Sequence, residues 1–429
     1  MRILSADWVV PIEGPPIRDG AVAIEGGRIA AVGEASELGE GEHHPDAVIL
    51  PGFVNAHSHL EYAAYAGFGD GLAFPPWLGL HIERKSRLDG DDMLAIARAG
   101  AAECLRSGIT TVGDCSFSGA AAHACAELGL RATVYLEVFG SDAGLARFHR
   151  LRGDAASAFS DRVRVGISPH APYTCTIELY RACAELELPL ATHLSESEAE
   201  LEYLATGGGP WEEIAEFLVP PLDGSAVPAL AGAGVLGPHV VAAHCVHVAA
   251  DEIALLAEHG VGVAHCPRSN ALLGCGIAPL RALREAGVAV AIATDSPAST
   301  PSFDMFDELR VAVMTARARE QRPDALSTGD ALELATLGGA RVLGMVDEVG
   351  SIVPGKQADL TVLSLAGSPF LPWEDPVTAT VLGGSPERIV ATLVSGETRY
   401  EKGGKAWPEL TAGAHSARSR LLSHVAATS

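Results

Sequence analysis

Several features are scarce or absent in this chain of 429 residues, and each absence excludes a class of protein. Lysine and arginine number 30 against 54 aspartates and glutamates, so the net charge is −24 with histidine neutral. Such a charge repels phosphate backbones and anionic lipids, which argues against nucleic-acid and membrane partners. No apolar run reaches the roughly 18 residues of a membrane-spanning helix, and the first residues lack the apolar stretch of a signal peptide.

Cysteine is sparse and unpatterned: the chain holds eight cysteines and no CxxC pair. In a chain of this length that usage is typical of reduced thiols in a cytoplasmic protein. Hydrophobic residues make up 48% of the chain and charged residues 20%, which is enough for a large core and too apolar for disorder. We therefore expect a cytoplasmic, folded protein with a small-molecule partner; the composition leaves homo-oligomerisation open.

Short apolar runs alternate with helical patterns through most of the chain. Helical stretches such as Asp91–Arg106 end just before a glycine, here Gly108, which is a favoured residue at a helix C-terminus. Eight runs have the continuous apolar character of parallel strands buried on both faces: Ala47–His57, Ile109–Asp114, Arg131–Phe139, Val163–His170, Leu188–His193, Val240–His244, Val261–His265 and Val288–Asp295. This series predicts an α/β fold with a (β/α)8 TIM barrel, and a doubly wound sheet is the alternative.

The two ends of the chain have a different pattern. Gly26-Gly27 separates two short strand patterns, Ala21–Glu25 and Arg28–Val32, and strand patterns return after Gly350 at Ala358–Leu365 and Arg388–Val394. We therefore predict a small β-sandwich domain built from both termini, residues 1–50 and 346–429, beside a catalytic barrel of residues 51–345. The long connection over residues 194–239 could be a lid or an inert insertion.

Polar residues cluster where the predicted strands end. His57 and His59 lie two residues apart in the first strand and can therefore point the same way, while His193 and Asp295 end later strands. A lone HxH is weak evidence, because single histidines often sit satisfied in a core. Four such groups at strand ends are harder to place in an apolar core. Three imidazoles and one carboxylate suit one divalent metal, Zn²⁺ or Fe²⁺, with an open position for water.

These stretches resemble the amidohydrolase superfamily, in its cytosine-deaminase/chlorohydrolase-like branch. The resemblance spans residues 1 to about 400 in the expected order. The stretches that carry it are Pro51-Gly52-Phe53-Val54-Asn55-Ala56-His57-Ser58-His59, His193-Leu194-Ser195-Glu196, His244-Cys245-Val246-His247, Cys266-Pro267-Arg268-Ser269-Asn270, Thr294-Asp295-Ser296 and the return to a β-sandwich at Gly350–Leu360.

The resemblance implies a role for each matching residue. His57, His59, His193 and Asp295 are implied metal ligands, Glu196 the proton shuttle, and His244 a second catalytic residue beside Asp295, which doubles as a base. Binuclear members carry a lysine at the end of strand four, where this chain has Ser168-Pro169-His170, so a single metal is expected. The metal would lower the pKa of water for attack on a ring carbon.

Substrate contacts are implied at four further positions. Trp77 and Glu83 follow strand one, where adenosine-type deaminases hold the base and ribose, and His170 resembles a substrate contact of the same enzymes. Arg268 could hold a substrate carboxylate or simply tie loops together. His247, Cys245 and Cys266 are expected to serve packing, and the role of His265 stays open.

The predicted reaction is hydrolytic deamination of an aminopurine nucleoside. Strand three ends Tyr135-Leu136-Glu137-Val138-Phe139-Gly140, without the arginine with which deaminases of S-adenosylhomocysteine hold its tail. Four short motifs look more like the branch that deaminates aminodeoxyfutalosine, an intermediate of the futalosine route to menaquinone. They are Glu137-Val138-Phe139, Ser168-Pro169-His170-Ala171-Pro172-Tyr173, Thr206-Gly207-Gly208-Gly209-Pro210-Trp211 and Cys266-Pro267-Arg268-Ser269-Asn270. The alternatives are deamination of adenosine, methylthioadenosine, S-adenosylhomocysteine, guanine or cytosine, or chloride hydrolysis from a triazine. A non-catalytic scaffold is a further alternative, although it would lack part of the ligand set.

Overall fold

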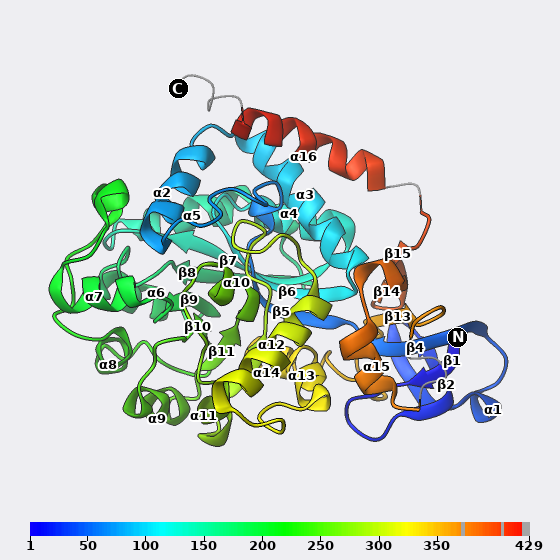
Figure 1. Cartoon of the computed structure of the whole chain (residues 1–429). Helices are drawn as coiled ribbons and strands as arrows, with labels where there is room; N and C mark the ends of the chain where they lie inside the picture. The colour runs from blue at the N-terminus through cyan, green and yellow to red at the C-terminus, as the bar shows by residue number, and fades with distance from the viewer. Residues whose placement is uncertain (370–373, 405–406, 423–429) are drawn as a thin grey trace.

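The computed structural model describes residues 1–369, 374–404 and 407–422, and its centre is a barrel of eight parallel strands (Figure 1). The strands are hydrogen-bonded in sequence order from β5 to β12. They are β5 (Phe53–Ser58), β6 (Ile109–Ser116), β7 (Arg131–Val138), β8 (Val163–Pro169), β9 (Leu190–Leu194), β10 (Val240–His244), β11 (Gly262–His265) and β12 (Ala289–Ile292).

The first and last strands close the ring. Ser58 and Asp295 form a parallel bridge, and the Asp295 backbone N–H donates to His57 O at 3.0 Å. This closure confirms the TIM barrel and excludes the doubly wound sheet. It also brings together two predicted metal ligands that lie more than 200 residues apart in sequence.

Helices surround the barrel and are set by local signals. In the longest, α3, Asp89 and Asp92 form a reciprocal capping box at the start, and Gly108 (φ 81°) follows its end. The helices are α1 (Ala35–Leu38), α2 (Phe74–Lys85), α3 (Gly90–Arg106), α4 (Ala120–Leu128), α5 (Gly144–Asp154), α6 (Ile177–Ala184), α7 (Glu198–Thr206), α8 (Ala226–Gly232), α9 (Ala250–Glu258), α10 (Pro267–Leu272), α11 (Leu280–Glu285), α12 (Met305–Glu320), α13 (Thr328–Leu334), α14 (Leu337–Val342), α15 (Pro376–Gly383) and α16 (Trp407–Leu422), with the short turns η1 (Leu60–Tyr62), η2 (Ala156–Ala158), η3 (Glu212–Phe217) and η4 (Pro386–Arg388).

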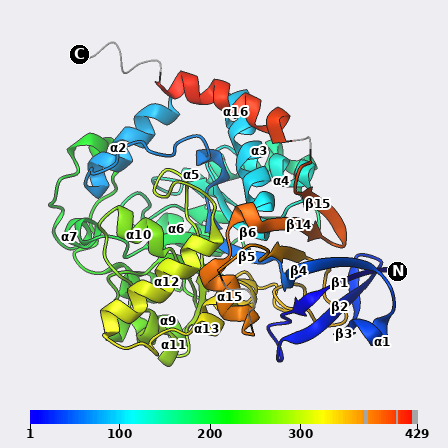
Figure 2. The ribbon, with the colours of Figure 1, turned by 45° about the vertical axis from the view of Figure 1, so that its right-hand side comes forward.

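Strands from both ends of the chain pair in one seven-stranded sheet beside the barrel (Figure 2). Its order is β15-β14-β13-β4-β1-β2-β3, so strands from both termini share a sheet that is separate from the barrel. The predicted hairpin turn lies at Gly26-Gly27, where both residues have positive φ. The strands are β1 (Arg2–Val9), β2 (Ile17–Glu25), β3 (Arg28–Glu34), β4 (Glu42–Pro51), β13 (Leu360–Ser364), β14 (Ile389–Val394) and β15 (Glu397–Glu401).

The run Ala47–His57, predicted as one strand, is two. Its first half belongs to β4 in the terminal sheet and its second half to β5 in the barrel. The break falls at Gly52, where a Cβ atom would lie 2.1 Å from Thr110 Cγ2. A glycine there lets the chain pass close to β6 as it moves from one sheet to the other.

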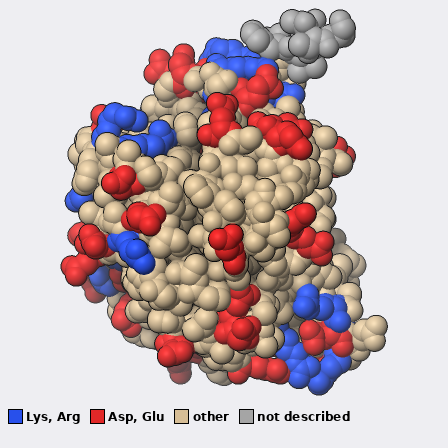
Figure 3. All heavy atoms as spheres, turned by 90° about the vertical axis from the view of Figure 1, so that its left-hand side faces the viewer, with Lys and Arg blue, Asp and Glu red and all other residues tan. Residues whose placement is uncertain are grey.

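The C-terminal helix α16 packs on α3 of the barrel, as Figure 1 shows at the upper side of the molecule. Arg420 pairs with Asp92, and Arg418 donates to the carbonyl oxygens of Ala64 and Ala66. In the part of the chain described here, no helix is both long and apolar enough to cross a membrane. Acidic side chains are spread over the face in Figure 3, which fits the negative charge of the sequence.

Candidate active site

Three histidines meet at the carboxyl ends of the barrel strands. His57 is the last but one residue of β5, His59 directly follows that strand, and His193 lies near the end of β9; all three are buried. One nitrogen from each lies within 4.8 Å of the others, and His59 Nε2 is 3.2 Å from His193 Nε2. The predicted histidine cluster is therefore assembled as the barrel topology requires.

The hydrogen bonds of two histidines fix where their lone pairs point. His59 Nδ1 donates to Cys115 O at 3.0 Å, and His193 Nδ1 donates to His170 O at 2.8 Å. Each Nε2 of these neutral rings is then an acceptor, and burial holds the pKa of both imidazoles well below the usual value. Two lone pairs 3.2 Å apart repel each other unless a cation lies between them. The donor set therefore fits a divalent metal ion.

Asp295 completes this set from the turn after β12. Its Oδ2 accepts from Ser269 Oγ at 2.6 Å and Ser299 Oγ at 2.8 Å, while Oδ1 lies 3.6 Å from the Nε2 atoms of His57 and His59. Burial raises the pKa of Asp295, but the adjacent histidines outweigh burial and leave that pKa well below its usual value. An ionised Oδ1 thus faces the histidines, as a metal ligand requires.

A second group of possible ligands includes a thiol. Cys266 Sγ lies within 4.8 Å of nitrogens of His57 and His244. Burial raises the pKa of the Cys266 thiol well above its usual value, which disfavours the thiolate that binds metals. The cysteine also donates to Ala264 O at 3.6 Å. The packing role expected for Cys266 fits this environment better than ligation.

Glu196 reaches the cluster from the turn after β9. It is 4% exposed, and its Oε1 lies 3.6 Å from His244 Nε2. Burial raises its pKa well above the usual value, and the carboxylates of Asp295 and Glu200 act in the same direction. A buried carboxyl group with a raised pKa binds a proton more readily than an exposed one, which suits a group that accepts and then releases a proton in general acid–base catalysis.

Glu200, which the sequence reasoning missed, fixes this turn from helix α7. Its two oxygens accept from the backbone N–H groups of Ser195 at 2.9 Å and Glu196 at 2.7 Å, and the residue is fully buried. Ser195 itself has a positive φ of 51°, a conformation rarely adopted by non-glycine residues. The sequence signal that could have identified Glu200 is its spacing of four residues from Glu196 at the start of a helix.

His244 faces Glu196 from the end of β10. Its Nδ1 donates to Asn270 Oδ1 at 2.9 Å, which leaves Nε2 directed to the site as an acceptor in the neutral ring. Burial lowers the pKa of His244 to about 4. Its φ of 71° is unusual for a residue with a Cβ, and the hydrogen bond to Asn270 helps to hold the ring there.

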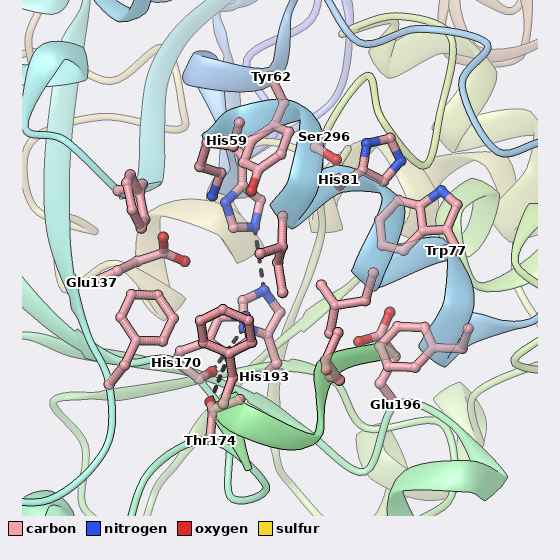
Figure 4. Close-up of a pocket in the computed structure, with 18 of the residues that line it drawn as sticks. His59, Tyr62, Trp77, His81, Glu137, His170, Thr174, His193, Glu196 and Ser296 are labelled. Carbon is pink, nitrogen blue, oxygen red and sulfur yellow. Dashed lines mark hydrogen bonds between the residues drawn. The ribbon is translucent and has the colours of Figure 1, made fainter. Parts of the chain in front are cut away.

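A cavity of about 460 Å³ opens above these residues (Figure 4). This volume lies in the range of roughly 300–1,000 Å³ that is usual for small-molecule sites. The walls are mainly apolar, with polar groups at the histidine cluster and at Glu137. Three residues of the 194–239 segment, Glu196, Ile214 and Phe217, line it, so this segment forms part of the wall. The described structure shows one arrangement of the segment, and its predicted role as a lid stays a prediction.

Two of the four predicted substrate contacts line the cavity, Trp77 on α2 and His170 after β8. The Thr174 hydroxyl donates to Ala171 O and accepts from His170 Nδ1 at 2.8 Å. In the neutral ring, which burial favours by lowering the pKa to about 3, His170 Nε2 is therefore an acceptor available to a ligand.

The structure contradicts the prediction for Glu83. This residue is exposed on the outer face of α2, where it pairs with Arg87, and it is not among the residues that line the cavity. The helix turns Trp77, His81 and Lys85, spaced four residues apart, toward the cavity instead. Glu83 lies six residues after Trp77 and consequently faces solvent.

Arg268 is likewise not a cavity residue. Its Nε donates to Glu308 Oε1 at 2.6 Å and its Nη2 to the Ser302 carbonyl oxygen at 2.6 Å, and the residue is buried. Glu308 lies in α12, 40 residues further along the chain. The geometry matches the alternative reading, an arginine that ties loops together, and contradicts binding of a substrate carboxylate.

The structure also brings charged residues to the cavity that were not predicted as contacts. Glu137 near the end of β7 and Lys85 at the end of α2 both line it, with Tyr62, Phe117 and Phe139 around them. In the sequence, Glu137 stands in the end of strand three, where no arginine occurs, and in a short motif of the resemblance, and neither pattern predicted a contact for it. His265 is 1% exposed and does not line the cavity, so it is a core residue at the end of β11.

Known proteins resemble this chain over most of its length. A 5'-deoxyadenosine deaminase of Methanothermobacter thermautotrophicus is 35% identical over 404 residues, which cover 90% of each chain. A 5-methylthioadenosine/S-adenosylhomocysteine deaminase of Moorella thermoacetica is 34% identical over 423 residues, 94% of this chain and 95% of the relative.

Solved structures give the same picture. The structure of an adenosine deaminase of Xanthomonas campestris with bound zinc superposes with a TM-score of 0.88 at 29% identity, covering 98% of both chains. An atrazine chlorohydrolase of Arthrobacter aurescens complexed with zinc reaches 0.82 at 22% identity over 97% of this chain and 100% of that one, a likeness of fold alone.

Two family models match the sequence. Residues 20–40 match the bacterial imidazolonepropionase-like composite domain. Residues 48–399 match the amidohydrolase family. This range runs from the end of the N-terminal strands through the barrel and into the C-terminal strands. With this match and the relatives at 34–35% identity, the chain belongs to the amidohydrolase family.

Proposed function

We propose that this protein deaminates the adenine ring of a 5′-modified adenosine nucleoside, with Glu196 as the group that moves the proton. That the chain is a hydrolytic deaminase follows from its family and from the relatives above. The observation that carries the residue assignment is the buried Glu196 carboxyl, 3.6 Å from His244 and beside the histidine–aspartate cluster, at one end of an apolar cavity.

His57, His59, His193 and Asp295 would hold a single divalent metal ion, for which we propose zinc, with iron as the alternative. When bound, such an ion lowers the pKa of a water molecule, so that hydroxide is available at neutral pH. The orienting hydrogen bonds from the rings to Cys115 O and His170 O keep the donor atoms aimed at one point.

The proton transfers are assigned to the chain's own side chains. Glu196 takes one proton from the attacking water and passes it to a ring nitrogen of adenine. It then takes the second proton of that water from the newly formed C–OH group and gives it to the amino group, so that the C–N bond breaks and ammonia leaves. His244 Nε2 and Asp295 Oδ1 border the point of attack and orient the water. Water and aminopurine thus become the hydroxypurine and ammonia.

For the natural substrate we propose aminodeoxyfutalosine, which carries an adenine, a sugar and a distant benzoate. The support is the absence of an arginine at the end of β7 and the short motifs quoted above. Relatives named for 5'-deoxyadenosine and for 5-methylthioadenosine/S-adenosylhomocysteine make those nucleosides the main alternatives. The likeness to an atrazine chlorohydrolase is one of fold, so triazine hydrolysis has no support from the site itself.

The test is a panel of aminopurine substrates assayed for ammonia and for the ultraviolet change of deamination. The panel holds adenosine, 5′-deoxyadenosine, methylthioadenosine, S-adenosylhomocysteine and aminodeoxyfutalosine, with guanine and atrazine as outgroups. We expect turnover of adenine nucleosides and the highest kcat/KM for aminodeoxyfutalosine. No turnover of any adenine nucleoside by metal-loaded protein would contradict the proposed activity, whereas equal turnover of all of them would contradict only the choice of substrate.

A further inference from the structure

The cavity has a second polar end that the chemistry of deamination does not use. In Figure 4, Glu137 and Glu196 lie on opposite sides of His59 and His193. Glu137 is 2% exposed, and among the described residues no side chain donates a hydrogen bond to its carboxylate. Arg147 reaches Glu137 only at the backbone carbonyl oxygen, at 3.0 Å. A buried carboxylate that faces a cavity without a partner is costly unless a ligand supplies donors.

Lys85 stands beside this carboxylate. Its Nζ lies 4.5 Å from the ring centroid of Tyr62 and 4.1 Å from that of Phe117. It makes no hydrogen bond to another described residue, and it is the one lysine or arginine among the residues that line the cavity there. The two aromatic faces stabilise the ammonium and shield its sides, which leaves its donors to the cavity.

The surrounding groups balance these two charges. The nearby carboxylate of Glu61 accepts from Ser118 N at 2.9 Å and Ser118 Oγ at 3.0 Å, so it is fully engaged in the loop after β6. Burial raises the pKa of Glu137, and Lys85 and Arg147 counteract that rise. Glu137 and Lys85 therefore form an acceptor and a donor side by side, both directed at whatever fills the cavity.

We propose that Glu137 and Lys85 bind the half of the substrate that lies away from the reacting ring. Glu137 accepts hydrogen bonds from the sugar hydroxyls, and Lys85 binds a carboxylate at the end of the 5′ substituent. This inference rests on the proposed function, because the position of Glu196 sets which end of the nucleoside reaches the cavity's far side. It gives the substrate class as nucleosides with free sugar hydroxyls and an anionic 5′ substituent.

The assignment replaces the one made for Arg268. A cation is needed because the chain carries −24 overall, and an unpaired carboxylate entering this cavity would be repelled. Arg268 is already bound to Glu308, so its guanidinium is unavailable. Lys85 supplies this cation from the cavity wall. The rings of Tyr62 and Phe117 beside it also offer an apolar surface to the part of the 5′ substituent between the sugar and the carboxylate.

Two substitutions test the two halves of the proposal separately. Lys85→Met should raise KM for aminodeoxyfutalosine at least tenfold while leaving kcat/KM for 5′-deoxyadenosine within threefold. Glu137→Gln keeps the shape and removes the charge, and it should raise KM for adenosine at least tenfold while leaving 2′,3′-dideoxyadenosine within threefold. Glu83→Gln, on the outer face of the same helix, is the matched control and should change neither.

The outcomes separate this proposal from the proposed function. Wild-type protein that deaminates no adenine nucleoside would overturn the proposed function, and the nucleoside subsite with it. The subsite would be overturned if the wild type is active and the variants fold and bind metal normally but lose the same activity on both substrates of a pair. The pairs are aminodeoxyfutalosine with 5′-deoxyadenosine, and adenosine with 2′,3′-dideoxyadenosine. Unchanged kinetics in both variants would overturn the subsite equally. Thermal unfolding and metal content of each variant distinguish misfolding from a loss of recognition, and Lys85→Arg should restore part of the carboxylate preference.

Discussion

The two ends of the cavity differ in how their polar side chains are held. At the catalytic end, His59, His193 and Asp295 lie at or just after strand ends of one closed barrel, and hydrogen bonds to backbone or serine groups fix the orientation of their side chains. At the far end, Lys85 comes from helix α2 and Glu137 from β7, and neither hydrogen-bonds through its charged group within the described residues.

This difference has a functional meaning. Groups that perform chemistry must be held within fractions of an ångström, and strand ends supported by the sheet provide that precision. Groups that select a substituent can sit on a helix outside the barrel, where the sequence can change without disturbing the metal site. We infer that family members with the same three histidines and aspartate share the catalytic end. We also infer that Glu137 and Lys85 at the far end determine which substrate this chain accepts.

The largest effect is expected from removing a metal ligand. His57→Ala or Asp295→Ala should abolish both metal binding and turnover, because a three-nitrogen, one-oxygen site is left incomplete. Metal content by elemental analysis and ammonia release give the measurement, with Glu83→Gln as the control. Full metal occupancy in both variants would contradict the ligand set.

Next comes the proton shuttle. Glu196→Gln should retain the metal and lose turnover by roughly 100-fold or more, because a carboxamide of nearly the same shape cannot carry a proton. The comparison to make is kcat and metal content against the wild type. A variant that binds metal and turns over within tenfold of the wild type would show that Glu196 is not the shuttle.

A smaller effect on catalysis is expected at Glu200, which holds the turn that carries Glu196. Glu200→Gln keeps one acceptor oxygen for the two backbone donors, so we expect kcat to fall by about tenfold with KM little changed. Steady-state kinetics on one nucleoside measure this split. A rise in KM at constant kcat would instead place Glu200 in substrate binding.

Arg268 should affect stability and leave substrate choice unchanged. Arg268→Met leaves the buried Glu308 carboxylate without its partner, which costs about 3–5 kcal/mol of unfolding free energy. Denaturant unfolding measures that loss, and the ratio of kcat/KM between aminodeoxyfutalosine and 5′-deoxyadenosine should stay as in the wild type. A loss of kcat/KM confined to the carboxylate-bearing substrate would show instead that Arg268 contributes to substrate binding.

The same two regions explain how far the sequence could be interpreted. The strand ends were predictable because continuous apolar runs in series specify a barrel, and a barrel gathers strand ends on one face; β10, for example, has the predicted bounds Val240–His244. The split of Ala47–His57 was missed because its two halves have the same apolar pattern, and only the close passage of Gly52 by Thr110 separates them.

The substrate contacts were harder to predict because they depend on the rotation of one helix and on distant partners. Trp77 does line the cavity, but Glu83 faces solvent because the register of α2 turns Lys85 inward. Applying helical periodicity from Trp77 would have identified Lys85. The role of Arg268 depended on Glu308, a residue in another helix whose position no local pattern reveals.

The central claim is that the histidine–aspartate cluster holds a divalent ion on which deamination depends. It is tested most directly by ammonia release from 5′-deoxyadenosine and aminodeoxyfutalosine before and after chelation, and again after stoichiometric addition of zinc. We predict that chelated protein remains folded, releases no ammonia, and regains activity with one equivalent of metal. Ammonia release at the original rate by metal-free protein would contradict the account.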